Sequence, residues 1–113
     1  MGDCIFCKII SGQIKSQILH QDDTAIAFKD INPQAPTHVL IVPRKHIPCL
    51  AASGDGDELL LGHLQHVARD LARTLGVEAA FRLVTNNGRG AGQTVDHLHY
   101  HMLGGRRMTW PPG

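Results

Sequence analysis

Three histidines stand at alternate positions in the segment 97–103, which reads His-Leu-His-Tyr-His-Met-Leu. Successive side chains of a β-strand point to opposite faces, so this segment is expected to be a strand with all three imidazoles on one face. Histidines two residues apart are then about 6.6 Å apart, twice the rise of about 3.3 Å per residue. One phosphate can contact two such rings but not all three, which predicts separate roles. Imidazole is a nucleophile, a general acid/base and a metal ligand, so the segment is either a catalytic row or a metal site.

With 113 residues, of which 42% are hydrophobic and 19% charged, the chain has the size and composition of one globular domain, residues 1–113. A net charge of +1 and 4% aromatic residues do not suggest a nucleic-acid-binding surface. No apolar run approaches the ~20 residues that cross a bilayer, and the N-terminus lacks the pattern of a signal peptide. Three cysteines, an odd number, favour a reducing compartment. We expect a cytoplasmic protein with no nucleic-acid or membrane partner.

The remaining chain predicts an α+β fold. Short apolar segments predict strands at 17–20, 24–28, 37–42 and 80–85, besides the histidine segment, and a short helix is expected at 4–10. Apolar residues at helical spacing predict one long helix that starts at Asp57 and Glu58 and stops at Gly76. Its apolar positions are Leu60, Leu64, Val67, Leu71 and Leu75. Strands followed by one long helix and two more strands favour an antiparallel sheet of about five strands.

A polar, glycine-rich loop at 86–93 leads into the histidine segment. Glycines allow backbone N–H groups to converge, and such loops bind anions. This favours phosphoryl chemistry, because one ring nitrogen can attack phosphorus and later leave as protonated imidazole, while a second imidazole holds phosphate oxygens. The metal interpretation stays open, because His-x-His on a strand is also good zinc-ligand geometry.

With these residues, the chain resembles the histidine-triad (HIT) superfamily, whose signature is His-φ-His-φ-His-φ-φ with φ apolar. It is most similar to the histidine-triad nucleotide-binding branch, and the resemblance extends to the segments 4–10, 30–38, 103–106 and 110–113. It implies a HIT-like fold with one long and one short helix and a homodimer. The implied activity is hydrolysis of purine nucleoside 5′-phosphoramidates, such as adenylyl-lysine, to AMP or GMP.

The resemblance also implies roles for individual residues. His99 matches the nucleophile, His101 the histidine that contacts phosphate, and His97 the one whose carbonyl orients the nucleophile. His38 matches an upstream histidine that hydrogen-bonds within the triad, and Asp30 matches the acid that binds ribose hydroxyls. The positions that match the phosphate-contacting loop are Asn86, Gly92, Thr94 and Val95, with Thr94 where the family more often has serine. Its hydroxyl is expected to deliver a proton to the leaving group.

An apolar pocket for the base is expected from Ile5, Phe6, Ile9, Phe28 and Ile31. Asp96 departs from the family, where an aromatic residue is usual. By strand alternation Asp96 is expected on the face of Leu98, Tyr100 and Met102, opposite the histidines. There it would alter packing or a local hydrogen bond rather than remove the nucleophile.

The pair Cys4-x-x-Cys7 is typical of metal sites and of redox pairs. In HIT relatives such a pair joins two histidines around a structural zinc, and the matching histidines here are His46 and His97. Two thiolates and two imidazoles form a closed tetrahedral site, which is structural rather than catalytic. The implied chemistry requires no cofactor, so zinc is expected only in this structural role.

Three other functions remain open from the sequence. A dinucleoside-polyphosphate hydrolase or nucleotidyltransferase would use the same histidines with another leaving group. A non-catalytic nucleotide-binding or scaffold dimer would bind without turnover. A metallohydrolase would use His97 and His99 as catalytic metal ligands, although no acidic residue lies within the triad to support it.

Overall fold

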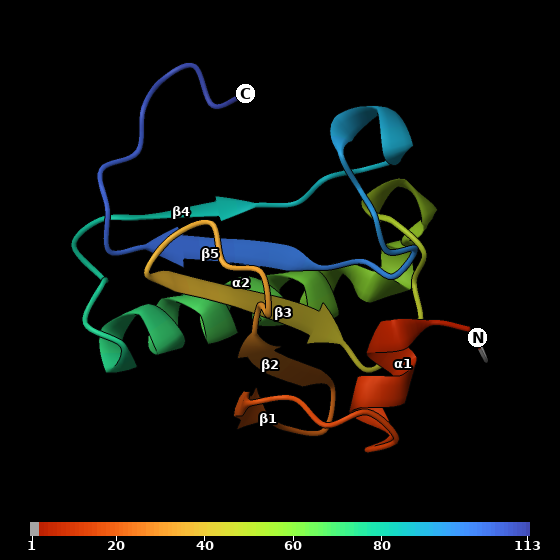
Figure 1. The fold of residues 1–113 in the computed structure, drawn as a ribbon. Helices are drawn as coiled ribbons and strands as arrows, with labels where there is room; N and C mark the ends of the chain where they lie inside the picture. Colours follow the sequence, from red (N-terminus) through yellow and green to blue (C-terminus); the bar gives the residue numbers. More distant parts are fainter. Residues whose placement is uncertain (1–2) are drawn as a thin grey trace.

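A computed structural model describes residues 3–113. The chain forms a five-stranded antiparallel sheet with the strand order β1-β2-β3-β5-β4, flanked by one short and one long helix (Figure 1). The helices and strands are α1 (Ile5–Ile10), β1 (Ile18–Gln21), β2 (Ala25–Lys29), β3 (Thr37–Pro43), α2 (Glu58–Thr74), β4 (Phe81–Val84) and β5 (Tyr100–Gly104). The predicted α+β class and its antiparallel sheet are confirmed.

The helix α2 covers one face of the sheet. Leu64, Val67 and Leu71 are buried, as their helical spacing predicted, and they pack on Val39 and Ile41 of β3. The face of the sheet under α2 is therefore a closed apolar core that supports β3.

Among residues 3–113, no helix is long and apolar enough to cross a membrane.

The short helix α1 covers part of the opposite face. Its only buried residue, Phe6, packs against Phe28, Leu40 and Val42. Leu40 and Val42 share this face with His38, as strand alternation predicted. The central strand β3 is buried on both sides and carries His38 to the α1 face.

The histidine segment differs from its prediction. The strand β5 begins at Tyr100, so only His101 of the three histidines lies in the sheet. The preceding amides bond elsewhere: the N–H of His97 donates to Val95 at 2.9 Å, and that of Leu98 donates to Ile47 at 2.6 Å. These bonds hold the segment outside the sheet, so strand alternation does not apply there.

Asp96 shows the consequence of this irregular backbone. It is exposed, whereas Leu98 and Tyr100 are buried at 1% and 7% exposure, so the prediction that Asp96 shares their face was wrong. Its carboxylate instead accepts a hydrogen bond from Arg89 at 3.0 Å.

Candidate active site

A cavity of about 300 Å³ opens on the α1 face of the sheet. It brings together the five apolar side chains predicted for the base pocket and two of the three histidines, and several other predicted residues line it. The predicted residues in its lining are Ile5, Phe6, Ile9, Phe28, Asp30, Ile31, Thr94, Val95, His99 and His101. Residues from α1, from the end of β2 and from the histidine segment thus meet at one cavity.

The two nitrogens of His99 have different environments. Nδ1 lies 2.6 Å from the backbone carbonyl oxygen of His97, and a carbonyl only accepts, so Nδ1 carries the proton. Burial lowers the pKa of His99 despite the opposing effects of this bond and of Asp30, which favours the neutral ring. Nε2 then keeps its lone pair. Nε2 bonds to no residue of the described part of the chain. Every buried side-chain nitrogen or oxygen in that part has a hydrogen-bond partner, so the unpartnered Nε2 is open to solvent.

A second chain of hydrogen bonds fixes His101. The N–H of Gln34 donates to Nδ1 of His38 at 3.0 Å, so the proton of the neutral His38 ring lies on Nε2. That nitrogen is 2.9 Å from Nδ1 of His101 and 3.4 Å from the Asp30 carboxylate. His101 Nδ1 therefore accepts, and its Nε2 carries a proton. His99 thus offers a lone pair and His101 a donor, and their ring centroids are 5.0 Å apart.

The third histidine, His97, is turned away from this cavity and is completely buried. Its Nε2 donates to the carbonyl of Pro43 at 2.8 Å, which leaves Nδ1 as a bare lone pair. This Nδ1 lies 3.4 Å from the Cys4 sulfur, 3.6 Å from the Cys7 sulfur and 3.1 Å from Nδ1 of His46. The four predicted ligands therefore converge on one point.

The spacing of these four atoms fits a tetrahedral zinc site. With Zn–S and Zn–N bonds of about 2.3 and 2.0 Å, tetrahedral geometry places sulfur and nitrogen about 3.5 Å apart and two nitrogens about 3.3 Å apart. The Cys7 to His46 distance is 3.3 Å, and all four ligand atoms lie within 4.8 Å of one another. The bond from His97 to Pro43 has the geometry of an outer-shell partner that orients a metal-bound imidazole.

The glycine-rich loop differs from expectation. The N–H groups of Gly88, Ala91, Gly92 and Gln93 donate within the loop, and Gly92 adopts φ +98° beside Asn86. Asn86 and Gly92 do not line the cavity, so the structure does not bring them to the other site residues. These four amides do not converge on an anion site, because a 3₁₀ turn at Arg89–Ala91 folds the loop on itself.

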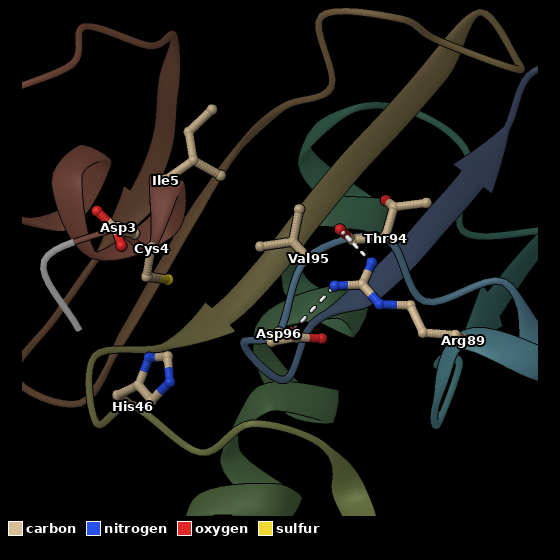
Figure 2. A pocket seen from close by; sticks show the side chains of 8 residues that line it. All are labelled: Asp3, Cys4, Ile5, His46, Arg89, Thr94, Val95 and Asp96. Atoms are coloured by element: carbon tan, nitrogen blue, oxygen red, sulfur yellow. Dashed lines mark hydrogen bonds and ion pairs between the residues drawn. The ribbon is translucent and has the colours of Figure 1, made fainter.

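A second cavity, of about 350 Å³, adjoins the first and shares Ile5, Thr94 and Val95 with it. Figure 2 shows Arg89 on the same side of this cavity as Thr94 and Asp96, with its guanidinium bonded to the backbone of Thr94 and to the carboxylate of Asp96. The bond to the carbonyl of Thr94 is 2.7 Å long. Asp96 therefore acts locally, as predicted, by pairing with the arginine that holds this segment.

Comparison with known proteins agrees with this geometry. The HIT domain family matches residues 11–108 of the chain. The chain belongs to the HIT domain family. An uncharacterized HIT-like protein of Synechocystis is 54% identical over 98% of this chain and 97% of its own length. A HIT family hydrolase from Legionella pneumophila has a similar structure, with a TM-score of 0.96, 47% identity, and coverage of 98% of this chain and 100% of its own.

A histidine triad nucleotide-binding protein from Candida albicans is a more distant relative in structure. It has a TM-score of 0.83 and 34% identity, over 96% of this chain and 83% of its own. The HIT fold is therefore shared across these proteins.

Several residues that position the site of this HIT protein could not be predicted from its sequence. The N–H of Gln34 and the carbonyl of Pro43 set the protons of His38 and His97, but backbone groups give no signal in the residue types. The buried Gln93 donates to Pro48 at 2.7 Å, and a buried glutamine in a polar loop looks like any exposed one. Arg89 is similar, since the two backbone carbonyls and the Asp96 carboxylate that it bonds to are brought together only by folding.

The titration of His101 is a direct test of this arrangement. Burial, then the neighbouring His99 and His38 rings, lower the pKa of His101 from 6.5 to about 4, against the opposing effect of Asp30. Between these two pH values the unfolded chain binds more protons, so His101 makes the fold less stable as the pH falls through that window. Titration of the His101 ring by ¹H–¹³C NMR is expected to give a midpoint near pH 4. A midpoint near 6.5 contradicts a half-buried imidazole that stays neutral.

Proposed function

We propose that this HIT protein is a hydrolase that cleaves purine nucleoside 5′-phosphoramidates to nucleoside monophosphates through a nucleotidyl-histidine intermediate. The observation that carries the proposal is His99, whose Nδ1 is bound to the His97 carbonyl at 2.6 Å while its Nε2 is open and its ring lines the cavity. A neutral imidazole held in this tautomer is a prepared nucleophile. The similarity to the Legionella hydrolase and the Candida nucleotide-binding protein supports the same activity class.

The cavity suggests how such a substrate binds. The base is proposed to lie between the apolar side chains of Ile5, Phe6 and Ile9 on one side and Ile31 on the other. Ile31 is 94% exposed, which leaves it free to cover a planar ring. The Asp30 carboxylate at the cavity wall can accept from both ribose hydroxyls.

In the first step, Nε2 of His99 attacks the α-phosphorus. A bond between Nε2 and phosphorus forms, the bond between phosphorus and the amine nitrogen breaks, and the amine leaves with a proton. Thr94 lines both cavities, and its hydroxyl is proposed to relay that proton from solvent to the amine, giving one proton to the leaving group as it takes up another from water. Splitting one difficult displacement into two lowers the barrier of each.

In the second step, water attacks phosphorus, the bond to His99 breaks, and the monophosphate leaves. Negative charge on the phosphoryl oxygens is proposed to be met by the Nε2–H of His101, because Nδ1 of that ring is occupied by His38. The segment at Thr94 and Val95 can contribute its backbone, whereas the bonded loop amides at 88 and 91–93 cannot. Contacts of Asn86 and Gly92 with phosphate remain a prediction.

We also propose that Cys4, Cys7, His46 and His97 hold a structural zinc. Zinc would cross-link α1 to the segment after β3 and to the histidine segment, and so fix the backbone that orients His99. The four ligands leave no open position, which assigns zinc no part in the reaction. Among the described residues, no group of metal-ligating side chains contains both His97 and His99, so nothing supports a metallohydrolase built on that pair.

A homodimer is proposed as well. The strand β4 lies at the edge of the sheet, where its outer side is free to pair with another chain. The C-terminal segment passes beside β4 in Figure 1, where Arg82 donates to the carbonyl of Thr109 at 2.8 Å. The next residue, Trp110, is 81% exposed. A free sheet edge beside an exposed tryptophan is typical of a surface that associates.

Substitution of the proposed nucleophile tests the activity. Wild type is expected to hydrolyse an adenosine phosphoramidate, and His99→Ala to lose roughly a thousandfold or more in kcat/KM. His66→Gln, which changes an exposed histidine of α2, is the matched control and should keep full activity. AMP binding by wild type without turnover would favour a scaffold protein, and turnover of dinucleoside polyphosphates alone would favour another leaving group.

The zinc proposal has a spectroscopic test. Co²⁺ added in place of zinc is expected to give thiolate-to-cobalt charge-transfer absorption in wild type and in Cys49→Ser, whose cysteine lies outside the cluster. The double variant Cys4→Ser/Cys7→Ser should lose this absorption, together with the metal-dependent part of the thermal stability. If phosphoramidate hydrolysis needs the bound metal in samples that stay folded, the purely structural role is wrong.

The dimer proposal is tested by mass in solution. Multi-angle light scattering on the full chain is expected to give about twice the 12.3 kDa of one chain. A mass of one chain across the accessible concentration range contradicts a stable dimer.

A further inference from the structure

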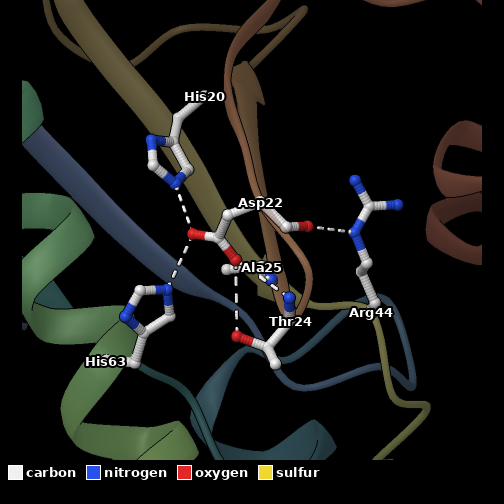
Figure 3. Close-up of polar contacts among 6 residues, drawn as sticks. All are labelled: His20, Asp22, Thr24, Ala25, Arg44 and His63. Atoms are coloured by element: carbon white, nitrogen blue, oxygen red, sulfur yellow. Dashed lines mark hydrogen bonds and ion pairs between the residues drawn. The ribbon is translucent and has the colours of Figure 1, made fainter.

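A second cluster of metal-ligating side chains lies on the opposite face of the sheet from the cavity. His20 from the end of β1, Asp22 from the turn between β1 and β2, and His63 from α2 meet there (Figure 3). Nε2 of His20 lies 2.6 Å and Nε2 of His63 lies 2.7 Å from the same oxygen, Oδ2 of Asp22. The three ligand atoms all lie within 4.8 Å of one another.

The surroundings hold the carboxylate of Asp22 in place. Its other oxygen, Oδ1, accepts from the N–H groups of Thr24 and Ala25, both at 2.9 Å, and from the Thr24 hydroxyl at 3.3 Å. Arg44 donates to the backbone carbonyl of Asp22 at 2.6 Å, and its guanidinium lies away from Oδ2 in Figure 3. Oδ2 is therefore the one carboxylate oxygen left for the histidines, and an orienting outer shell of this kind is what metal-bound carboxylates have.

The carboxylate is also ionised. Although burial raises the pKa of Asp22, the hydrogen bonds from His20, Thr24, His63 and Ala25 outweigh it and hold the pKa well below its usual range. An ionised carboxylate only accepts, so Nε2 of His20 and Nε2 of His63 each carry a proton that points at Oδ2, while the Nδ1 atoms of both rings make no hydrogen bond within residues 3–113. A cation bound at this point would displace the two protons from Nε2, and each ring would then carry its proton on Nδ1, which no protein contact blocks.

We propose that His20, Asp22 and His63 form a second site for a divalent transition-metal cation of the zinc class. Two imidazoles and one carboxylate are a ligand set such ions take, with solvent completing the coordination. At bond lengths of about 2.0–2.1 Å the ligand atoms stand about 3.3 Å apart, so each nitrogen must move from Oδ2 by roughly 0.6 Å. The side chains are 33%, 29% and 41% exposed, which leaves them room for that movement and the ion a path to enter.

The bound ion would act on the fold rather than on the reaction. It would join α2 to the β1–β2 hairpin, at the edge of the sheet opposite β4. A cation that binds only the folded chain stabilises it against unfolding. The site shares no residue with the Cys4, Cys7, His46 and His97 cluster, so the two can be filled and emptied independently.

The test is a count of bound Zn²⁺ per chain, by equilibrium dialysis of the full chain at micromolar free Zn²⁺. His63→Gln is expected to bind one equivalent fewer than wild type and to lose several degrees of the rise in Tm that Zn²⁺ produces. His66→Gln, three residues further along α2 and exposed, is the matched control and should keep the wild-type count. The comparison measures a difference, so it does not depend on whether the cysteine cluster holds zinc.

A second variant and a spectroscopic measurement on wild type distinguish loss of the metal site from misfolding of a variant. His20→Gln should lose the same equivalent, and long-range ¹H–¹⁵N NMR of wild type should show Zn²⁺ displacing the Nε2 resonances of His20 and His63 together. If both glutamine variants keep the wild-type count, or if Zn²⁺ leaves both Nε2 resonances unchanged, the cluster is a hydrogen-bonded contact and the proposal is wrong.

Discussion

The reactive arrangement depends on one hydrogen bond, from Nδ1 of His99 to the backbone carbonyl of His97 at 2.6 Å. This bond decides which nitrogen of His99 keeps a lone pair, and hence which nitrogen can act as a nucleophile. The carbonyl can do so because the side chain of His97 is held in place: its buried ring donates to Pro43 from one nitrogen and faces two cysteines with the other. One residue thereby joins the proposed zinc cluster to the proposed nucleophile.

The two faces of the sheet have different roles, one in the stability of the fold and the other in the proposed reaction. The α2 face is filled with aliphatic side chains and carries most of the buried core, while the α1 face carries the cavity and the triad. Buried imidazoles are costly when charged, and His38, His99 and His101 all have a lowered pKa because of burial. The neutral forms that burial favours are the ones that the hydrogen-bond chain from Gln34 through His38 to His101 requires.

Much of the fold was predictable, because period and composition are local properties. The helix α2 follows from Leu64, Val67 and Leu71 at helical spacing, and β3 from an apolar run that ends at Pro43. The prediction failed where non-local hydrogen bonds decided the backbone. Alternation at 97–103 indicated a strand, but the bond from Leu98 to Ile47 removes its first half from the sheet. The glycine loop was expected to present amides to an anion, and a 3₁₀ turn uses four of them internally.

The sequence by itself predicted the class of chemistry, since three alternating histidines after a glycine-rich loop favour phosphoryl transfer or metal binding, and a Cys-x-x-Cys pair is typical of metal sites and of redox pairs. It also determined the α+β class, because the spacing of apolar residues along each segment distinguishes helices from strands. Only the tertiary structure decided which imidazole nitrogen is free, since this depends on backbone carbonyls at positions 43 and 97 and an amide at position 34. It alone brought His20, Asp22 and His63 together, because 41 residues separate Asp22 from His63 and only the packing of α2 against the sheet closes that distance.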